Sequence, residues 1–505
     1  MTRTTASAHH LLDLPYDIFV LVARFMDVRA HLALGSTCST LREYFATPSL
    51  WLALARDMLE IRPLPVPPLR TVASLSAAEL RRAVVHAARL EENLSGQARL
   101  QSSQQFNIDG GKDLELLTVL PGARHLVTSK EADSIACWDL HSGKCVASWP
   151  FHKGDRVLQC RPVDGGRACM FIVFVAGTNF ERGWFQLLRL AFTETEREAE
   201  DEGADISAEF VRHIMFNEPD QLISDMSLSE DVVTMITVHE DTREVSLVLL
   251  SWREGSVCVG RTNVHVDVGP SVHPINWPLF TLLSPTCVNI LWDDLEHPFI
   301  HRYPNDCLFP HLSVPAGAPI TLPSAPAQTI KFENNTDDFV AWVPYSSLAH
   351  RHWDTSLHGD QPHLSRELSN WRTFQRDNMN VLAHSSLPVP YDDEVRVRTF
   401  FAPCDVVVGA PSTDPRDLLM IAESKHALWL ERQPDDVVLL RICSFPSDDM
   451  RQLKESPEWY TERLARTLEV PDGLDLSSVC DMALSEAHGI VVLSLLDGTL
   501  WTLQY

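Results

Sequence analysis

The chain has 505 residues, of which 45% are hydrophobic and 22% charged, and it carries a formal net charge of -26. This length predicts two or three folding units, and the composition is typical of a folded globular protein, not of a disordered or collagen-like one. Residues 1–100 hold 11 Arg, no Lys and 9 acidic residues, so the negative charge belongs to the rest of the chain. Because so acidic a body repels phosphate, we expect neither nucleic acid nor an anionic membrane as a partner.

Neither a membrane span nor an exported form is expected. The longest apolar stretch, Cys169 to Ala176, is far shorter than the roughly 18 residues of a membrane-spanning helix. Residues 1–10 are polar and lack the apolar core of a secretion signal. The eleven cysteines include no Cys-x-x-Cys pair, which predicts reduced thiols without a disulfide framework or a structural zinc site. We therefore expect a cytoplasmic or nuclear protein.

The spacing of apolar residues predicts four short helices near the N-terminus. Asp13 is a candidate cap for the first helix, and Pro15 presets the backbone of its first turn. Apolar residues then recur on one helical face. The first expected helix opens at Leu14-Pro15 and carries its apolar face from Ile18 to Phe25. The others run from about Ala30 to Leu34, through Cys38 to Phe45, and from Pro48 through Leu54.

A proline-rich connector and a longer helix are expected next. Residues 62–69 contain four prolines, which cannot continue a helix and favour an extended, semi-rigid segment. Ser76 and Glu79 form a capping box before an amphipathic helix that reaches about Asn93. Its arginines are also compatible with a calmodulin-type or membrane-surface helix, but the short apolar stripe favours a stalk between two modules.

From about Asp113 the apolar period changes from 3.6 to 2, which is typical of strands. Residues 114–150 contain four short apolar runs, a pattern that suits one propeller blade. Near the C-terminus, Asp497-Gly498 lies between two apolar runs and predicts a tight hairpin, because glycine supplies the positive φ of its turn. Further strand clusters are expected at 157–192, 223–262, 272–303, 329–343 and 395–443, which gives six or seven blade-like units.

The sequence thus predicts a multidomain chain with a small all-α bundle followed by an all-β body. The body fits a divergent six- or seven-bladed β-propeller best, although an antiparallel sandwich has the same pattern. The expected boundaries are 8–60 for the bundle, 61–112 for the linker and stalk helix, and 113–505 for the body. Two polar loop inserts are expected in the body, at the acidic run 194–205 and the His-rich stretch 346–393.

Five short motifs follow one another in the expected helices. They are Leu14-Pro15-x-Asp17-Ile18, Phe25-Met26-Asp27, Leu32-Ala33-Leu34, Ser36-Thr37-Cys38 and Pro48-Ser49-Leu50-Trp51. This ordered series of about 38 residues resembles the F-box. Ser39, Thr40 and Leu41 depart from the pattern, since many family members have two basic residues and a tryptophan there.

The resemblance implies an orthogonal helix bundle whose apolar surface packs on helices of a Skp-type adaptor. So short a bundle cannot bury every apolar face of its helices, which leaves aliphatic side chains for a partner. We expect Phe25 and Leu41 to fill the bundle's own core, and either role for Val22 and Trp51. Carried over position by position, the residues at or supporting the adaptor interface are Leu14, Pro15, Ile18, Val22, Leu32, Leu34, Cys38, Leu50 and Trp51.

A second resemblance lies in the body. The stretch Ser134 to Leu140 closes in Trp138-Asp139 and is followed by Ser142-Gly143-Lys144. This is similar to the end of a WD repeat, in which a strand ending in Trp-Asp leads through a turn to a return strand. Trp292-Asp293 echoes it, whereas Trp429 and Trp501 keep only the tryptophan. Because the Gly-His dipeptide that usually opens such repeats is missing, the resemblance implies a divergent propeller.

We expect no catalytic residue, no cofactor and no metal. The sequence contains no phosphate-binding glycine loop, nucleophile elbow, zinc-protease helix or calcium loop. The best metal-ligand candidates lie in a polar stretch without the rigid flanking strands that hold metal ligands in place. They are His350, His352, Asp354, His358 and His363.

The resemblance implies a non-catalytic substrate-recognition subunit of a Skp/cullin/F-box ubiquitin ligase. The F-box would bind the Skp-type adaptor and, through it, a cullin scaffold, while the body holds an unidentified protein target near the charged E2 enzyme. The acidic body predicts a basic or apolar target segment. The alternative is an interaction scaffold that binds a Skp-type partner outside a ligase. A third interpretation, an enzyme with an F-box appended, would require a catalytic cluster that the sequence does not show.

Overall fold

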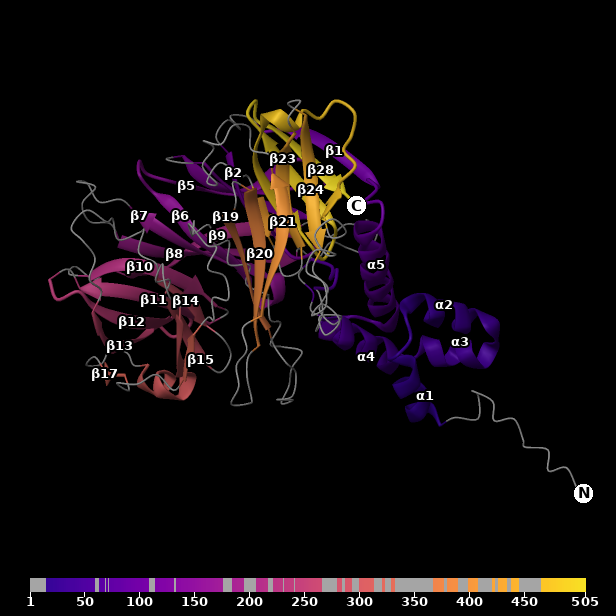
Figure 1. Cartoon of the computed structure of the whole chain (residues 1–505), viewed down its shortest axis with the longest axis horizontal. Helices are drawn as coiled ribbons and strands as arrows, with labels where there is room; N and C mark the ends of the chain where they lie inside the picture. Colours follow the sequence, from indigo (N-terminus) through magenta and orange to yellow (C-terminus); the bar gives the residue numbers. More distant parts are fainter. Residues whose placement is uncertain are drawn as a thin grey trace, which may run out of the picture.

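Short helices lie beside a larger body of antiparallel sheets, and helix α5 joins the two parts (Figure 1). The computed structural model describes residues 15–505 apart from 60–62, 69, 71, 109–113, 131–132, 176–183, 195–205, 217–220, 230, 240, 266–278, 284–286, 293–298, 313–319, 323–327, 332–366, 377–378, 389–397, 407–419, 423–425, 434–436 and 445–464. The helices are α1 (Tyr16–Ala23), α2 (Val28–Thr37), α3 (Ser39–Ala46), α4 (Pro48–Leu59) and α5 (Ala77–Ser95), here called the helical region. The four short helices and the longer fifth helix of the prediction are all present.

Side-chain caps explain where two of the helices begin. The Asp27 carboxylate accepts the backbone N–H of Ala30 at 2.6 Å, and α2 therefore begins two residues before its predicted start. At α5 the predicted capping box is confirmed: the Ser76 hydroxyl accepts the N–H of Glu79 at 3.3 Å, and the Glu79 carboxylate accepts the N–H of Ser76 at 2.7 Å.

Seven sheets follow one another along the described part of the body. The first contains β2 (Leu114–Val119), β3 (His125–Lys130), β4 (Ser134–Asp139) and β5 (Lys144–Pro150). The second contains β6 (Arg156–Val163), β7 (Ala168–Val175), β8 (Trp184–Glu194) and β9 (Ile206–Phe216). The third contains β10 (Gln221–Leu228), β11 (Val232–His239), β12 (Glu244–Ser251) and β13 (Ser256–His265), with β17 (Ile320–Thr321) parallel to β13.

The remaining sheets complete the body. The fourth contains β14 (Leu279–Leu283), β15 (Cys287–Trp292), β16 (Phe299–Pro304) and β18 (Gln328–Lys331), and the fifth contains β19 (Glu367–Arg376), β20 (Met379–Pro388) and β21 (Arg398–Val406). The sixth contains β22 (Met420–Ala422), β23 (His426–Arg432), β24 (Val438–Ser444) and β25 (Ala465–Thr467). The seventh contains β26 (Val479–Ser485), β27 (Ile490–Leu495), β28 (Thr499–Gln504) and β1 (Ser102–Asn107).

Strand β1 brings the two ends of the body into one sheet. It pairs antiparallel with β28, from Ser102 opposite Gln504 to Asn107 opposite Thr499. The prediction places residues 102–107 in the linker instead, because this exposed, polar edge strand has no apolar alternation to reveal it. The predicted hairpin between β27 and β28 is confirmed, with Gly498 at a φ of 88°.

Neighbouring sheets pack face to face through apolar side chains. Among the described residues, five apolar clusters each join two neighbouring sheets. Leu126 and Val492 belong to the cluster between the first and seventh sheets, and Leu428 and Leu493 to the one between the sixth and seventh. The other three join the first and second sheets (Val127, Phe171), the second and third (Met170, Val233), and the third and fourth (Leu247, Ile290). The first strands of successive sheets also contact one another, in the order β22, β26, β2, β6, β10 and β14. This arrangement is β-propeller-like, as the sequence predicts, and differs from a two-sheet sandwich.

A repeated irregularity occurs in these first strands. β2, β6, β10 and β26 each contain one register shift, and such bulges turn peptide groups and side chains out of the ladder. In β6, the residue after the shift is Gln159, whose side-chain oxygen accepts the N–H of Leu228 in the next sheet at 3.1 Å. In β26, the corresponding residue is Asp481, whose carboxylate accepts the N–H of Leu116. Polar side chains therefore join the first strands of neighbouring sheets.

The structure describes part of one predicted loop insert and almost none of the other. The second half of the stretch 346–393 is not a loop insert, since β19 and β20 form a sheet there with β21. Its strand signal, the alternation of Val381, Ala383 and Leu387, is short and lies among polar residues. Apart from Glu194 in β8, the acidic insert lies outside the described residues, as do all five metal-ligand candidates.

Candidate functional site

Helix α1 turns one face toward the core of the helical region. Its inward residue Phe19 is 1% exposed and packs against two rings of α3, with centroid distances of 5.1 Å to Tyr44 and 5.4 Å to Phe45. Leu50 and Trp51 of α4 complete this core, and the Trp51 indole N–H donates to the carbonyl of Phe45 at 2.6 Å. These contacts leave the opposite face of α1 without cover from the described residues.

Polar contacts fix both ends of α1 against α4. The Tyr16 hydroxyl bonds to the Thr47 hydroxyl and to that of Ser49, the latter at 2.8 Å. At the other end, Nε of Arg24 donates to the Asp57 carboxylate at 2.7 Å. Helix α1 therefore lies alongside α4 with a defined orientation, and its outer face is presented by a rigid element.

The outer face of α1 is an exposed apolar surface, here called the α1 face. It consists of Ile18, Leu21, Val22 and Phe25, which are 40%, 52%, 40% and 93% exposed. Among the described residues, the other large apolar side chains with comparable exposure are scattered over four sites in the body. Single exposed apolar residues are common, but a group of four on one helical turn and the next marks a contact surface.

The structure separates the predicted interface residues into three groups. Leu14 lies outside the described residues. Pro15, Ile18 and Val22 are exposed, Leu32, Leu34 and Cys38 are partly buried against the helical core, and Leu50 and Trp51 are fully buried within it. The last two are placed to support an interface from beneath.

The expectation that Phe25 fills the core is wrong. Phe25 follows the last turn of α1 and continues the spacing that begins at Ile18, so it extends the outward face. The aromatic side chain of α1 that points into the core is Phe19, the residue directly after Ile18. Leu41 is buried as predicted, and of the two roles left open, Val22 takes the surface role and Trp51 the core role.

Helix α5 contributes to two apolar cores. Its first half, with Leu80, Val84 and Ala87, packs into the core of the helical region. Its second half, with Leu90 and Leu94, packs against the sixth and seventh sheets. The helix therefore belongs to both parts and is more than a connector between them.

The proline-rich linker is also packed. Leu64 is 4% exposed in the helical core, and His488 at the β26–β27 turn lies beside the backbone of Val66. A Cβ atom added at Gly122, in the β2–β3 turn, would lie 2.4 Å from the backbone nitrogen of Pro68. The linker thus lies against turns of the first and seventh sheets instead of spanning free space, as a semi-rigid connector would.

Two further kinds of site do not occur in the described residues. Within the described ranges, no three His, Cys, Asp or Glu side chains are grouped so that they could hold a metal ion. In the same residues, no helix is long and apolar enough to cross a membrane. The α1 face, with its four exposed apolar side chains, is the candidate functional site.

Comparisons with known proteins identify remote structural neighbours. No family model and no curated protein matches the chain. Hydrazine synthase of Kuenenia stuttgartiensis is 10% identical, with a TM-score of 0.41, covering 79% of this chain and 97% of its own. A chain of the mitotic checkpoint complex is 11% identical, with a TM-score of 0.35 and coverages of 81% and 92%. The Cps50 (Swd1) β-propeller domain of Myceliophteria thermophila is 9% identical, with a TM-score of 0.39 and coverages of 80% and 99%. Similarities this low carry no inference about function.

Proposed function

We propose that this chain is an F-box substrate receptor, which binds a Skp-type adaptor through the α1 face and a protein target through the β-body. The observation that carries the proposal is the exposed apolar surface formed by Ile18, Leu21, Val22 and Phe25. These residues lie in the segment whose motifs resemble the F-box, and two of them belong to the interface that the resemblance implies. Phe25 adds a large aromatic side chain to that surface.

The body fits a target-holding role because of its shape. We infer that its seven sheets close into a seven-bladed propeller, with β1 and β28 pairing to complete the last blade. Blade turns of such a ring gather at its two ends and provide rigidly held loops for binding. The chain itself performs no chemistry in this proposal; it raises the local concentration of the target near the ligase's E2 enzyme.

Co-elution in size-exclusion chromatography tests the adaptor contact. The full-length chain is mixed with a purified Skp-type adaptor, in parallel with the Ile18→Asp and Leu496→Asp variants. Ile18→Asp places a charge on the α1 face and should abolish co-elution. Leu496 is a matched control in the body, 63% exposed, and its variant should co-elute like the wild type. If Ile18→Asp still co-elutes, the α1 face is not the adaptor site.

Addition of the cullin separates a ligase receptor from a scaffold. A ternary complex of this chain, the adaptor and the cullin is expected for a receptor. If the adaptor binds through the α1 face but excludes the cullin, the chain acts as an interaction scaffold outside the ligase, and the proposal of target ubiquitination falls.

A further inference from the structure

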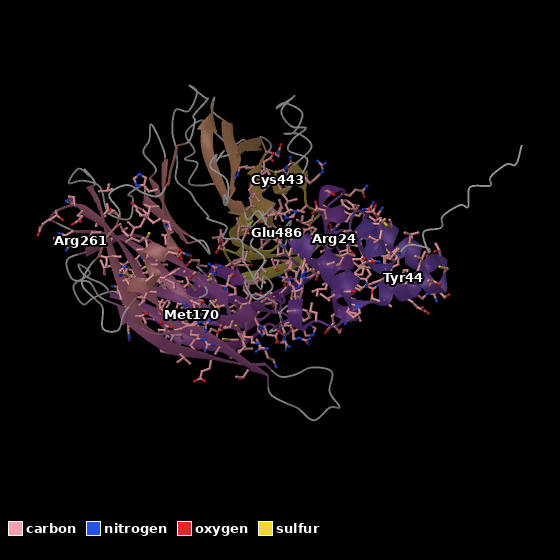
Figure 2. All side chains as sticks on the ribbon, turned by 90° about the horizontal axis from the view of Figure 1, so that it is seen from below. Arg24, Tyr44, Met170, Arg261, Cys443 and Glu486 are labelled. Atoms are coloured by element: carbon pink, nitrogen blue, oxygen red, sulfur yellow. The ribbon has the colours of Figure 1, made fainter. Side chains whose placement is uncertain are left out.

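A polar pair is buried where α5 meets the sheets. His426 begins β23 and Glu486 follows β26, and the two residues are 3% and 4% exposed. Nδ1 of His426 lies 3.0 Å from Oε1 of Glu486. Figure 2 labels Glu486 at the place where the last sheets face the helical region. Here we call the contact between the second half of α5 and the sixth and seventh sheets the joint. Around the pair, it is packed with Leu90, Leu94 and other apolar side chains.

Two small cavities flank this pair, each with about 10 Å³ of space for the centre of a water molecule. The linker-side cavity is lined by Pro63, Ala87, Leu90, Glu91, Leu94 and Ala487 together with the pair. The sheet-side cavity is lined, besides the pair, by Leu94, Ile442, Leu468, Leu484, Gly489, Val491 and Tyr505. Of the two cavities, only the linker-side one has a further carboxylate, Glu91, in its wall.

The second ring nitrogen of His426 requires a partner. Within the described residues, both ring nitrogens of His426 are buried and form no hydrogen bond, although Nδ1 lies near Oε1 of Glu486. A buried polar atom without a partner destabilises a fold, and an internal water usually supplies the missing bond. A cavity holds a water when it offers roughly 10 Å³ and two to four polar partners. The linker-side cavity meets both conditions.

We propose that one internal water occupies the linker-side cavity, bridges Nε2 of His426 to a carboxylate of the joint, and helps to hold α5 on the sheets. Nδ1 of His426 lies beside the Glu486 carboxylate, so Nε2 is the ring nitrogen that remains for the water. The water forms hydrogen bonds to Nε2 and to an oxygen of Glu486 or Glu91. The sheet-side cavity, whose wall beyond the pair is apolar apart from Tyr505, stays dry. This inference does not depend on adaptor binding.

A crystal structure that resolves ordered water tests the site directly. The expected result is one water about 2.7 to 3.2 Å from Nε2 of His426 in the linker-side cavity, with no water in the sheet-side cavity. In the His426→Leu variant this water should be absent. An empty linker-side cavity, a water in the sheet-side cavity alone, or Nε2 bonded to a protein group would each overturn the proposal.

Hydrogen exchange tests the role of the site in the joint. Amides of the second half of α5, residues 87–94, should exchange at least tenfold faster in His426→Leu, because the buried Glu486 carboxylate loses its contact with His426. The double variant His426→Leu/Glu486→Leu removes both polar groups and should restore most of the protection. His141→Leu, at an exposed site, is the control and should leave α5 unchanged. Two results would show that the polar site does not hold α5. One is an unchanged exchange rate in His426→Leu, and the other is a double variant whose α5 amides exchange as fast as those of the single variant.

Discussion

His125 and His488 are neutral in the fold because they are buried. Burial lowers the pKa of His125 to about 4, and the pKa of His488 is lowered to about 4 by burial together with the nearby His86. In the unfolded chain both rings bind a proton near pH 6.5. The folded state therefore binds fewer protons than the unfolded state between about pH 6.5 and 4. Their contribution to stability is complete above pH 6.5 and is lost as the pH falls through this range.

We therefore expect the free energy of unfolding to fall with acidification from pH 7 to pH 4.5. Each of the two histidines should contribute a slope of up to about 1.4 kcal/mol per pH unit. Urea unfolding of the wild type, His125→Gln and His488→Gln at several pH values checks this, because carboxyl groups titrate equally in all three. Each variant should have a shallower slope than the wild type, whereas the exposed-site variant His141→Gln should not. Equal slopes in all four proteins would contradict the assignment.

The aromatic residues of α1 show what a single sequence can and cannot predict at the level of the residue. The spacing from Ile18 to Phe25 correctly indicates one apolar face. Spacing does not say whether that face points inward, because Phe19 and Ala23 define a second apolar face on the same helix. The packing of α1 on α3 and α4 settles the choice, and these contacts are far apart in the sequence.

Short sequence motifs predict individual helices and turns well in this chain. They do not predict contacts between segments that are far apart in the sequence. The capping box at Ser76 and the hairpin at Gly498 were readable because each depends on residues a few positions apart. Strand β1 was missed because its pairing partner, β28, lies at the other end of the body. The packing of Pro68 on the β2–β3 turn was missed for the same reason.

The contact between the linker and the β2–β3 turn can be tested with a pair of glycines. Gly122 and Gly473 have φ values of 87° and 90°, so alanine brings the same backbone strain at both positions. Only at Gly122 would the new Cβ meet another segment, the backbone of Pro68. Gly122→Ala should lower the free energy of unfolding by about 1 to 3 kcal/mol more than Gly473→Ala in urea titrations. Equal losses would mean that the linker does not lie on this turn.

The bond across the seventh and first sheets gives a further prediction. Asp481→Ala leaves the N–H of Leu116 without its carboxylate acceptor between two packed sheets. The free energy of unfolding should fall by about 1 to 3 kcal/mol in denaturant titrations. Asp133→Ala is the matched control, because the Asp133 carboxylate forms an exposed ion pair with Lys130 at 3.4 Å, and its loss should cost well under 1 kcal/mol. A loss for Asp481→Ala no larger than for the control would contradict the role of this bond.

At the scale of the whole molecule, one continuous set of cores links the α1 face to the body. The helical core extends into the linker and the first half of α5, and the second half of α5 enters the core of the last two sheets. Because α5 leads into β1, which completes the seventh sheet, the helical region is fixed to the sheet that joins the ends of the body. A partner on the α1 face would therefore be held in a defined position relative to any target on the β-body.

The dissociation constant of the full-length chain for a purified Skp-type adaptor tests the central claim most directly, compared among the wild type, Phe25→Ala and Leu496→Ala. Phe25 is 93% exposed, so its truncation should leave the helical core intact while removing the largest apolar contact of the α1 face. We predict at least about 30-fold weaker binding for Phe25→Ala, corresponding to a loss of about 2 kcal/mol, and wild-type affinity for Leu496→Ala. An adaptor that does not bind the wild type, or that binds Phe25→Ala as tightly as the wild type, would contradict the account.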